Sequence, residues 1–198
     1  MQIAREVFGD RYDLAGQYID ILSSRGVDWG LIGPREVSRL WPRHVLNSVA
    51  VSSLIEPSAD VLDVGSGAGL PGIPLAILRP DLTVTLLEPL LRRFNFLTEA
   101  VRELGLDEQV RVVRGRAEEQ RSTYQVVTCR AVAPLPKLLG WCLPLVRPHG
   151  QLLAIKGENA EQELLDVQGV LRSRRLTGEV LLVRADPAAE PTWVVRIR

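Results

Sequence analysis

The stretch VLDVGSGAGLPGIP, residues 61–74, carries the strongest fold signal in the sequence. An apolar run at 61–64 is followed by glycines at 65, 67, 69 and 72 and by prolines at 71 and 74. An apolar run ahead of a glycine-rich loop is typical of a buried strand that leads into a helix, and proline suits the first helical turn. Because glycine has no side chain, a ligand can lie against the backbone of such a loop. The stretch therefore predicts a strand, a ligand-binding loop and a helix, in that order.

Short apolar runs recur on the carboxyl side of this stretch and alternate with helical patterns. Besides 61–64, we expect strands at 84–87, 110–113, 125–129 and 152–155, and helices at 71–78, 90–104, 135–146 and 158–172. This alternation predicts a parallel sheet with helices on both faces. Two further strand-like runs, 179–183 and 193–197, flank the turn-favouring pair Asp186-Pro187 and predict a terminal hairpin.

The part of the chain before the first strand has the spacing of amphipathic helices, interrupted at Pro42. A length of 198 residues suits one domain with a single core. We therefore expect an N-terminal helical segment, 1–58, packed on a core of residues 59–198 within one structural domain.

Charge and composition exclude several classes of protein. The chain has 24 Lys and Arg against 24 Asp and Glu, so binding of a nucleic acid would require a local basic face. Its two cysteines and two histidines lack metal-ligand spacing, and we expect no metal. Charged residues occupy the N-terminal region where a signal peptide needs an apolar stretch, and no apolar run approaches the roughly 18 residues that span a bilayer. We expect a cytoplasmic protein without a membrane partner.

The glycine loop taken alone fits two cofactors. Gly67, Gly69 and Gly72 have the spacing of a dinucleotide-binding loop, and Glu88 follows Gly67 by 21 residues, where a ribose-binding acid belongs. Asp63 favours S-adenosylmethionine instead, because a carboxylate ahead of the glycines would hold the cationic amino group of the methionine moiety but repel a pyrophosphate. The sequence favours S-adenosylmethionine and leaves an NAD-dependent oxidoreductase as the alternative.

Two further features agree with S-adenosylmethionine. Glu118 and Glu119 follow the third expected strand, placed to approach an adenine amino group, although acids at a helix N-terminus are also favoured by the helix dipole. A terminal hairpin is typical of the seven-stranded, mostly parallel sheet of Rossmann-like class I methyltransferases. We expect this α/β fold, with a cofactor site that includes Asp63, Gly65, Ser66, Gly67, Glu88 and Glu118.

The segment 63–76, DVGSGAGLPGIPLA, closely resembles the signature of the RsmG (GidB) family of bacterial 16S rRNA guanine-N7 methyltransferases. Its distinctive part is PGIP at 71–74, which generic methyltransferase loops lack. RHVLNS at 43–48, Arg130-Ala131 and Lys156-Gly157 resemble further elements of the family. The chain departs from the family pattern at Asn47, where aspartate is usual, and at Cys129, where serine is common.

The resemblance implies an S-adenosylmethionine-dependent enzyme that methylates N7 of a guanine in 16S rRNA, free or within the small ribosomal subunit. It also implies a monomer. Carried over to this sequence, the family's cofactor contacts fall on Gly65, Leu70, Ala117, Glu118 and Arg130.

The implied chemistry needs few side chains, because N7 of guanine has a lone pair, carries no proton and can attack in line without a general base. Arg130 and Lys156 end strands at the edge where such sheets bind ligands, and we assign them to orientation of the reactants. The alternative for both is a bridge that ties loops together. Candidate RNA contacts are Arg43, His44, Arg92, Arg93 and Lys156, although a histidine such as His44 is more often a packing residue.

Other acceptors leave signatures that the sequence lacks. Residues 128–131 read TCRA, where methyltransferases of exocyclic amines carry D/N-P-P-Y. Cys129 imitates the nucleophile of pyrimidine C5 enzymes, but a cysteine that ends a buried strand is usually packing. A small-molecule methyltransferase remains an alternative, although the rim arginines favour an open mouth facing a polyanion.

Overall fold

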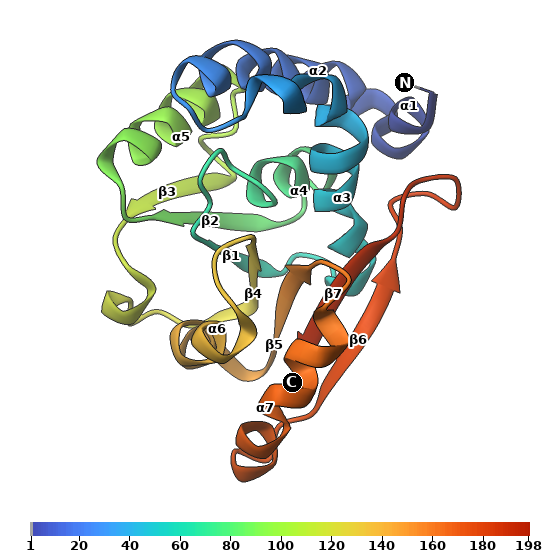
Figure 1. Cartoon of the computed structure of the whole chain (residues 1–198). Coiled ribbons are helices and arrows are strands. Elements are labelled where there is room, and N and C mark those ends of the chain that lie inside the picture. The colour runs from blue at the N-terminus through green and yellow to red at the C-terminus, as the bar shows by residue number, and fades with distance from the viewer. Residues whose placement is uncertain (1) are drawn as a thin grey trace.

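The computed structural model describes residues 2–198, which form a seven-stranded sheet with helices on both faces (Figure 1). The strands follow the order β3-β2-β1-β4-β5-β7-β6. Strands β1 to β5 pair in parallel, and β7 runs antiparallel to both β5 and β6. The predicted mostly parallel sheet with a terminal hairpin is confirmed. The strand bounds are β1 (Asp60–Val64), β2 (Thr83–Glu88), β3 (Val110–Arg114), β4 (Tyr124–Arg130), β5 (Val146–Lys156), β6 (Gly178–Val183) and β7 (Thr192–Ile197).

The helices cover the sheet in two layers. The N-terminal helices lie on one face with α4 and α5, whereas α6 and α7 lie on the other (Figure 1). The α-helices are α1 (Gln2–Phe8), α2 (Tyr12–Ile21), α3 (Asn47–Val49), α4 (Gly72–Leu78), α5 (Leu91–Glu103), α6 (Leu135–Cys142) and α7 (Ala160–Ser173). Shorter 3₁₀ turns are η1 (Gly9–Arg11), η3 (Pro34–Arg39), η5 (Ala50–Leu54), η6 (Ala117–Glu119) and η7 (Leu143–Leu145), and π-helical turns are η2 (Leu22–Gly26) and η4 (Leu40–Leu46).

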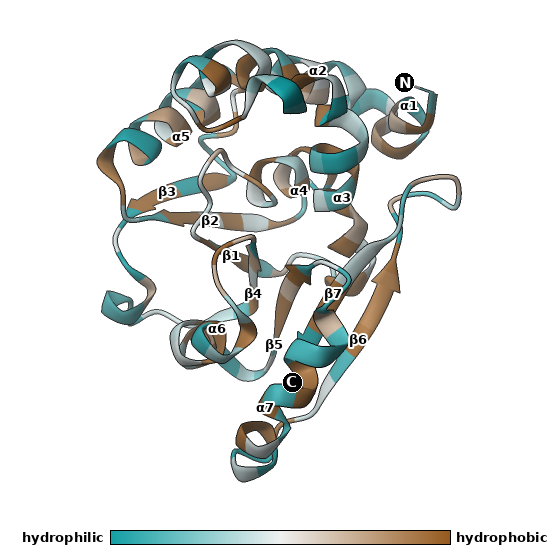
Figure 2. Ribbon diagram, viewed as in Figure 1, coloured by the Kyte–Doolittle hydropathy of each residue, from teal (hydrophilic) through white to brown (hydrophobic). Residues whose placement is uncertain are grey.

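Alternate residues of the central strands fill the two layers. On β1, Val61 packs under the N-terminal helices and Leu62 packs under α6 and α7. On β4, Val126 and Val127 divide in the same way. Strands that are buried on both faces read as continuous apolar runs, and Figure 2 shows apolar residues along the strands of this sheet. This is why the apolar runs of the sequence locate the strands.

Two details differ from the helices that the sequence predicts. The helix expected at 135–146 ends at Cys142, since Pro144 has no N–H to continue the ladder, and β5 begins at Val146. Pro42 does not interrupt the helical path but lies within η4, whose wider π-helical turn accommodates the proline ring.

The parallel strands bring four functional segments to one edge of the sheet. The carboxyl ends of β1, β2, β4 and β5 share this edge, where ligands bind in open α/β sheets. Across residues 2–198, no helix is long and apolar enough to cross a membrane. The same residues include no group of three or more His, Cys, Asp or Glu side chains able to hold a metal ion.

Candidate active site

The loop between β1 and α4 is held in a conformation that requires glycine. Gly65, Gly67 and Gly69 have φ angles of +71°, +58° and +97°. A Cβ atom on Gly69 would lie 2.4 Å from Cδ1 of Ile73. The backbone N–H groups of Gly65 and Ser66 donate hydrogen bonds to the carbonyl oxygen of Leu87 at the end of β2. The loop is therefore pinned to β2, with its backbone close to the edge of the sheet.

Glu88 joins the glycine loop to the end of β2, as its spacing predicts. Its side chain is buried, and its two oxygens accept hydrogen bonds from the N–H of Gly67 at 3.0 Å and from the N–H of Leu90 at 2.9 Å. A carboxylate at this position supplies negative charge next to the glycine backbone. Either oxygen of Glu88 could accept from a ligand hydroxyl group if it gave up its hydrogen bond to the backbone N–H.

Asp63 lies beneath the loop and is fully buried. Its Oδ2 accepts a hydrogen bond from the N–H of Gly72 at 3.0 Å, whereas Oδ1 is buried without a partner in the described part of the chain. Burial raises the pKa of this carboxyl from its ordinary value to about 7. An orphaned buried oxygen beneath a ligand-binding loop indicates a site built to receive a further donor or positive charge.

Three adjoining cavities open at this edge of the sheet. The β3-side cavity, about 190 Å³, lies between Gly65, Leu87, Ala117 and Trp141. The loop cavity, about 230 Å³, is lined by residues 65–68, Leu70 and the N-terminal segment. The β5-side cavity, about 530 Å³, lies between the ends of β4 and β5, α6, α7 and η4. Gly65 lines the first two cavities, Arg130 and Ala131 line the last two, and Val132 lines the first and third.

The residues around the first two cavities fit S-adenosylmethionine. The β3-side cavity has an apolar wall for a purine, and Glu118 stands at its rim. The glycine backbone lines the loop cavity, and the carboxyl groups of Glu88 and Asp63 are bonded to the N–H groups of Gly67 and Gly72. Acidic groups near this loop suit a cationic amino acid moiety. Of the predicted cofactor residues, Gly65, Ser66, Gly67, Leu70, Ala117, Glu118 and Arg130 line a cavity, whereas Asp63 and Glu88 lie behind the loop.

Arg130 ties the end of β4 to the N-terminal segment. Its guanidinium donates hydrogen bonds to the carbonyl oxygens of Arg43 and His44 at 3.1 and 2.9 Å and to Oγ of Ser48 at 3.1 Å. Burial lowers the pKa of Arg130. The contacts are those of a loop-tying bridge, yet the same side chain lines both the loop cavity and the β5-side cavity. Arg130 thus lies at the boundary between the loop cavity and the β5-side cavity.

His44 is held as a neutral ring within this network. Its Nδ1 lies 3.0 Å from Nη2 of Arg130 and its Nε2 lies 3.0 Å from Oε2 of Glu36. Arg130 has only donors, so Nδ1 accepts and Nε2 donates. Burial is the main cause that lowers the pKa of His44. These contacts describe a packing residue that orients Arg130.

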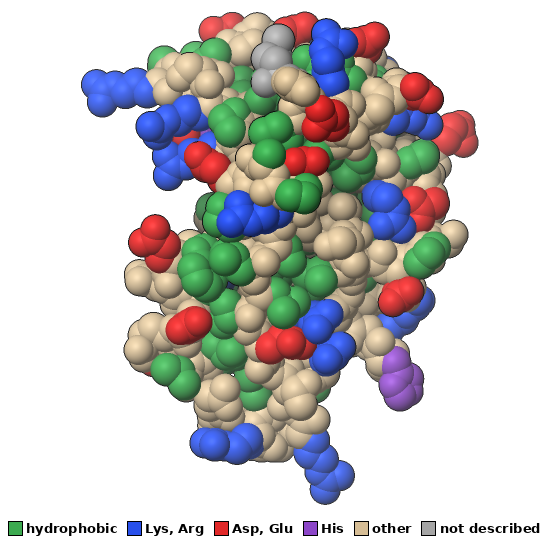
Figure 3. Space-filling view, turned by 90° about the vertical axis from the view of Figure 1, so that its right-hand side faces the viewer, with side chains coloured by type: hydrophobic (Ala, Val, Ile, Leu, Met, Phe, Trp, Pro, Cys, Tyr) green, Lys and Arg blue, Asp and Glu red, His purple; other side chains and the backbone are tan. Residues whose placement is uncertain are grey.

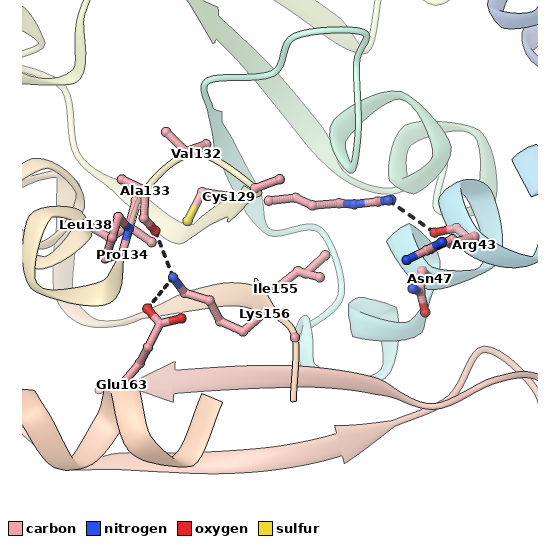
Figure 4. A pocket seen from close by; sticks show the side chains of 13 residues that line it. Arg43, Asn47, Cys129, Val132, Ala133, Pro134, Leu138, Ile155, Lys156 and Glu163 are labelled. Atoms are coloured by element: carbon pink, nitrogen blue, oxygen red, sulfur yellow. Dashed lines mark hydrogen bonds and ion pairs between the residues drawn. The ribbon is translucent and has the colours of Figure 1, made fainter. Parts of the chain in front are cut away.

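Lys156 also has internal partners (Figure 4). Its Nζ donates to the carbonyl oxygen of Ala133 at 2.8 Å and lies 2.7 Å from Oε2 of Glu163, with only 9% of the lysine side chain exposed. Both Lys156 and Glu163 line the β5-side cavity. Lys156 therefore forms the bridge between segments that the sequence left as an alternative, and this bridge is part of the cavity wall.

The expected RNA contacts do not form one cluster. Arg43 lines the β5-side cavity, and Arg93 and His44 line the loop cavity. Arg92 lies apart from these cavities, with its guanidinium 5.9 Å from the ring centroid of Trp29. On the face seen in Figure 3, Lys and Arg side chains are interspersed with Asp and Glu. The expected RNA contacts that reach the active edge are therefore divided between separate cavities.

The two residues that depart from the family pattern, Asn47 and Cys129, both line the β5-side cavity. Cys129 is buried, and its pKa is raised well above the ordinary value by the hydrogen bond with Cys142 and by burial. A protonated, buried thiol does not suit a nucleophile. The Oδ1 of Asn47 accepts a hydrogen bond from the hydroxyl of Thr192 at the start of β7. Asn47 thus fills a structural position with an uncharged side chain.

Sequence reasoning missed three residues of this site. The hydroxyl of Tyr18 donates to the carbonyl oxygen of Ala68 in the glycine loop, Trp141 lines the β3-side cavity, and Glu163 binds Lys156. Each lies on a helix, where its residue type is already explained by the apolar or charged face of that helix and gives no sign of a functional role. Only their tertiary neighbours distinguish them.

Comparisons with known proteins agree with this geometry. A family described as "rRNA small subunit methyltransferase G" matches residues 11–181. Ribosomal RNA small subunit methyltransferase G of Thermobifida fusca is 56% identical over 98% of this chain and 83% of its own length. The protein of that name from Mycolicibacterium smegmatis is 51% identical over 100% of this chain and 86% of its own length.

A solved structure shows the same fold at low identity. A methyltransferase from Geobacter sulfurreducens in complex with S-adenosyl-L-homocysteine superposes with a TM-score of 0.56, at 15% identity, over 78% of this chain and 90% of its own. The predicted class I methyltransferase fold and the predicted family are confirmed. The chain belongs to the family of rRNA small subunit methyltransferase G.

Proposed function

We propose that this chain transfers the methyl group of S-adenosylmethionine to N7 of a guanine in 16S rRNA. The observation that carries the proposal is the junction of the three cavities at Gly65 and at residues 130–132. A cofactor in the first two cavities would present its reactive end at the wall shared with the third. The relatives named above are ribosomal RNA small subunit methyltransferases, which supports rRNA as the substrate class.

The glycine loop, Glu88 and Glu118 would hold the cofactor. The β3-side cavity takes the adenine between its apolar walls, with Glu118 near the exocyclic amino group. Glu88, which lies beside Gly67, would accept from the ribose hydroxyl groups, and the unpartnered oxygen of Asp63 beneath the loop would accept from a donor at the amino acid end. When bound, S-adenosylmethionine supplies a sulfonium methyl group that the N7 lone pair attacks in line.

The β5-side cavity would take the guanine and is suited to an acceptor that needs no general base. No histidine lines it within the described chain, its cysteine is protonated, and its lysine is paired with Glu163. Since N7 carries no proton, none has to be removed. Arg130 and the wall at 131–133 would orient the base, and orientation alone can contribute several kcal/mol to the rate.

The RNA backbone would meet cationic groups around the cavities. Arg43 and Arg93 stand at two of the mouths, with Lys156 inside the β5-side cavity. Arg92 lies apart from the cavities on α5, against Trp29, and would meet the RNA only beyond their mouths. We also propose that the helical segment 1–58 and the core 59–198 fold as one structural domain, because Arg130 and Tyr18 join them at the site. The enzyme would act as a monomer.

The test is methyl transfer from labelled S-adenosylmethionine to small-subunit RNA, and to small-subunit particles, that lack the modification. Recovery of label as 7-methylguanosine is the expected result, and Gly65→Asp should abolish it. Gly105→Asp is the matched control, because Gly105 also has a positive φ but a Cβ there meets no atom within 4 Å. Label in another nucleoside would overturn the N7 assignment, and transfer only to small molecules would overturn the rRNA substrate.

A further inference from the structure

The side chain of Glu163 presents one unused carboxylate oxygen at the β5-side cavity. Its Oε2 accepts hydrogen bonds from Nζ of Lys156 at 2.7 Å and from the N–H of Leu135 at 2.6 Å. No hydrogen bond among residues 2–198 uses Oε1, and the side chain is 25% exposed. Because Oε2 anchors the carboxylate to β5 and to the start of α6, Oε1 is held in a fixed direction (Figure 4).

We propose that Glu163, together with Lys156, recognises the Watson–Crick edge of the target guanine and determines base specificity. The inference rests on the proposed function, since it concerns the base that would occupy this cavity. Guanine presents two adjacent donors on that edge, N1–H and the N2 amino group, next to the acceptor O6. A carboxylate and an ammonium group side by side match this pattern of donors and acceptor.

The position of the pair agrees with attack through N7. The wall shared with the cofactor cavities is formed by Arg130, Ala131 and Val132. N7 must face this wall, and N1 and N2 lie on the opposite side of the purine. Lys156 and Glu163 line the cavity from the end of β5 and from α7, and Ala133 lies between them and Val132 (Figure 4).

The hydrogen-bonding capacity of the pair is also sufficient. An ammonium group has three donors, and two of those of Lys156 are used by Ala133 and Glu163. The third is available for O6, while Oε1 of Glu163 has two lone pairs and accepts from both N1–H and N2–H. Adenine would place the unprotonated N1 against this oxygen, and its edge has no acceptor corresponding to O6. The pair thus favours guanine by attraction and disfavours adenine by repulsion.

A carboxylate at this edge would also favour the chemical step. Methylation at N7 leaves the guanine with the positive charge that the sulfonium loses. Positive charge makes N1–H and N2–H stronger donors, so their bond to Glu163 strengthens as the methyl group is transferred. An interaction that is stronger in the transition state than in the ground state accelerates the reaction.

The experiment compares Glu163→Gln with the wild-type enzyme on two RNAs, one with guanosine and one with inosine at the mapped target position. Inosine keeps N7, O6 and N1–H but lacks the N2 amino group. We expect the wild-type enzyme to prefer guanosine about 10-fold in kcat/KM, because a hydrogen bond to a charged group is lost with inosine. Glu163→Gln should lower kcat/KM for guanosine about 10- to 100-fold and methylate both RNAs at similar rates.

A second readout and a control separate recognition from folding. The affinity of each enzyme for both RNAs is measured without cofactor, where only the wild type should distinguish them. Cofactor affinity should change less than twofold in Glu163→Gln. Glu161→Gln is the matched control, because Glu161 is an exposed acid of the same helix that does not line the cavity. It should keep the wild-type preference.

The outcomes distinguish this inference from the proposed function. A wild-type enzyme that makes no 7-methylguanosine would overturn the proposed function, and the inference with it. Wild-type methylation at N7 with an unchanged guanosine preference in Glu163→Gln would overturn only the inference. Equal losses on both RNAs would leave Glu163 with a purely structural role. If Glu163→Gln does not fold, Glu163→Asp replaces it, and the carboxylate, shorter by one methylene group, should reduce the guanosine preference.

Discussion

The hydroxyl of Tyr18 donates a hydrogen bond to the carbonyl oxygen of Ala68, 50 positions further along the chain, at 2.8 Å. Tyr18 is fully buried on α2, and Ala68 lies in the glycine loop. A Cβ atom on Gly69 would lie only 3.2 Å from the same hydroxyl. The N-terminal helices therefore contact the cofactor loop directly and help to fix its conformation.

Tyr18→Phe should both weaken cofactor binding and destabilise the fold. The change leaves the Ala68 carbonyl without its buried donor, at a cost of about 1–3 kcal/mol. We expect the Kd for S-adenosylmethionine to rise about 10-fold by calorimetry, with methyl transfer recovering at saturating cofactor. Tyr124→Phe, at the amino end of the central strand β4, is the control. An unchanged Kd in Tyr18→Phe would show that the loop keeps its conformation without this contact.

Gly69→Ala and Gly105→Ala form a matched pair for the loop. Both glycines have positive φ, +97° and +63°, but only the added methyl group at 69 would collide, with Ile73 at 2.4 Å. Backbone strain costs both variants about 1 kcal/mol, and we expect Gly69→Ala to lose a further 1–3 kcal/mol by overpacking. Urea unfolding measures both. Equal losses would mean that Ile73 moves aside without cost.

Arg130→Lys should fail to replace the arginine. The guanidinium reaches four acceptors on the N-terminal segment, and an ammonium group cannot match this planar set. We expect a loss of about 2–3 kcal/mol in the free energy of unfolding, with kcat/KM lower by at least 10-fold. Arg111→Lys, on the exposed edge of β3, is the control. Wild-type activity in Arg130→Lys would contradict a role in orientation.

Asp63 should make stability depend on pH in an unusual direction. Its pKa is about 7 in the folded protein and near 3.8 in the unfolded chain, so between these values the folded state binds more protons. Stability contributed by this group is present below about pH 4 and is lost as pH rises to about 7. The difference in free energy of unfolding between wild type and Asp63→Asn should fall over this window by at most about 4 kcal/mol. A difference that rises with pH would contradict the buried, protonated carboxyl.

Cys129→Ser should retain methyl transfer within about threefold, since the thiol is buried and protonated and the reaction at N7 uses no nucleophilic cysteine. The native enzyme should also react with iodoacetamide at Cys129 only after unfolding, as measured by mass spectrometry. Loss of activity in Cys129→Ser, together with a covalent RNA adduct in the wild type, would indicate a pyrimidine C5 mechanism instead.

The centre of the sheet was predictable because β1, β2 and β4 are largely buried on both faces and read as apolar runs between turn residues. The N-terminal part was less predictable. The sequence predicts a break in the helices at Pro42, yet Pro42 lies within the π-helical turn η4. At the site, Glu88 lies beside the glycine loop as its spacing predicts. The partners of Arg130 and Lys156 were not predictable, since they lie up to 87 positions away in the chain. Glu163 carries no local signal that separates it from the other acids of α7.

The bond from Arg130 to the carbonyl oxygen of His44 spans 86 positions. During synthesis, at about 5–20 residues per second, η4 therefore emerges several seconds before β4, the strand that carries the partner of His44. Through that interval the N-terminal helices can pack only on β1, β2 and β3, which are made before β4. A nascent chain paused before β4 would leave one side of β1 unpaired, and an unpaired strand edge is a site where another chain can add and start aggregation.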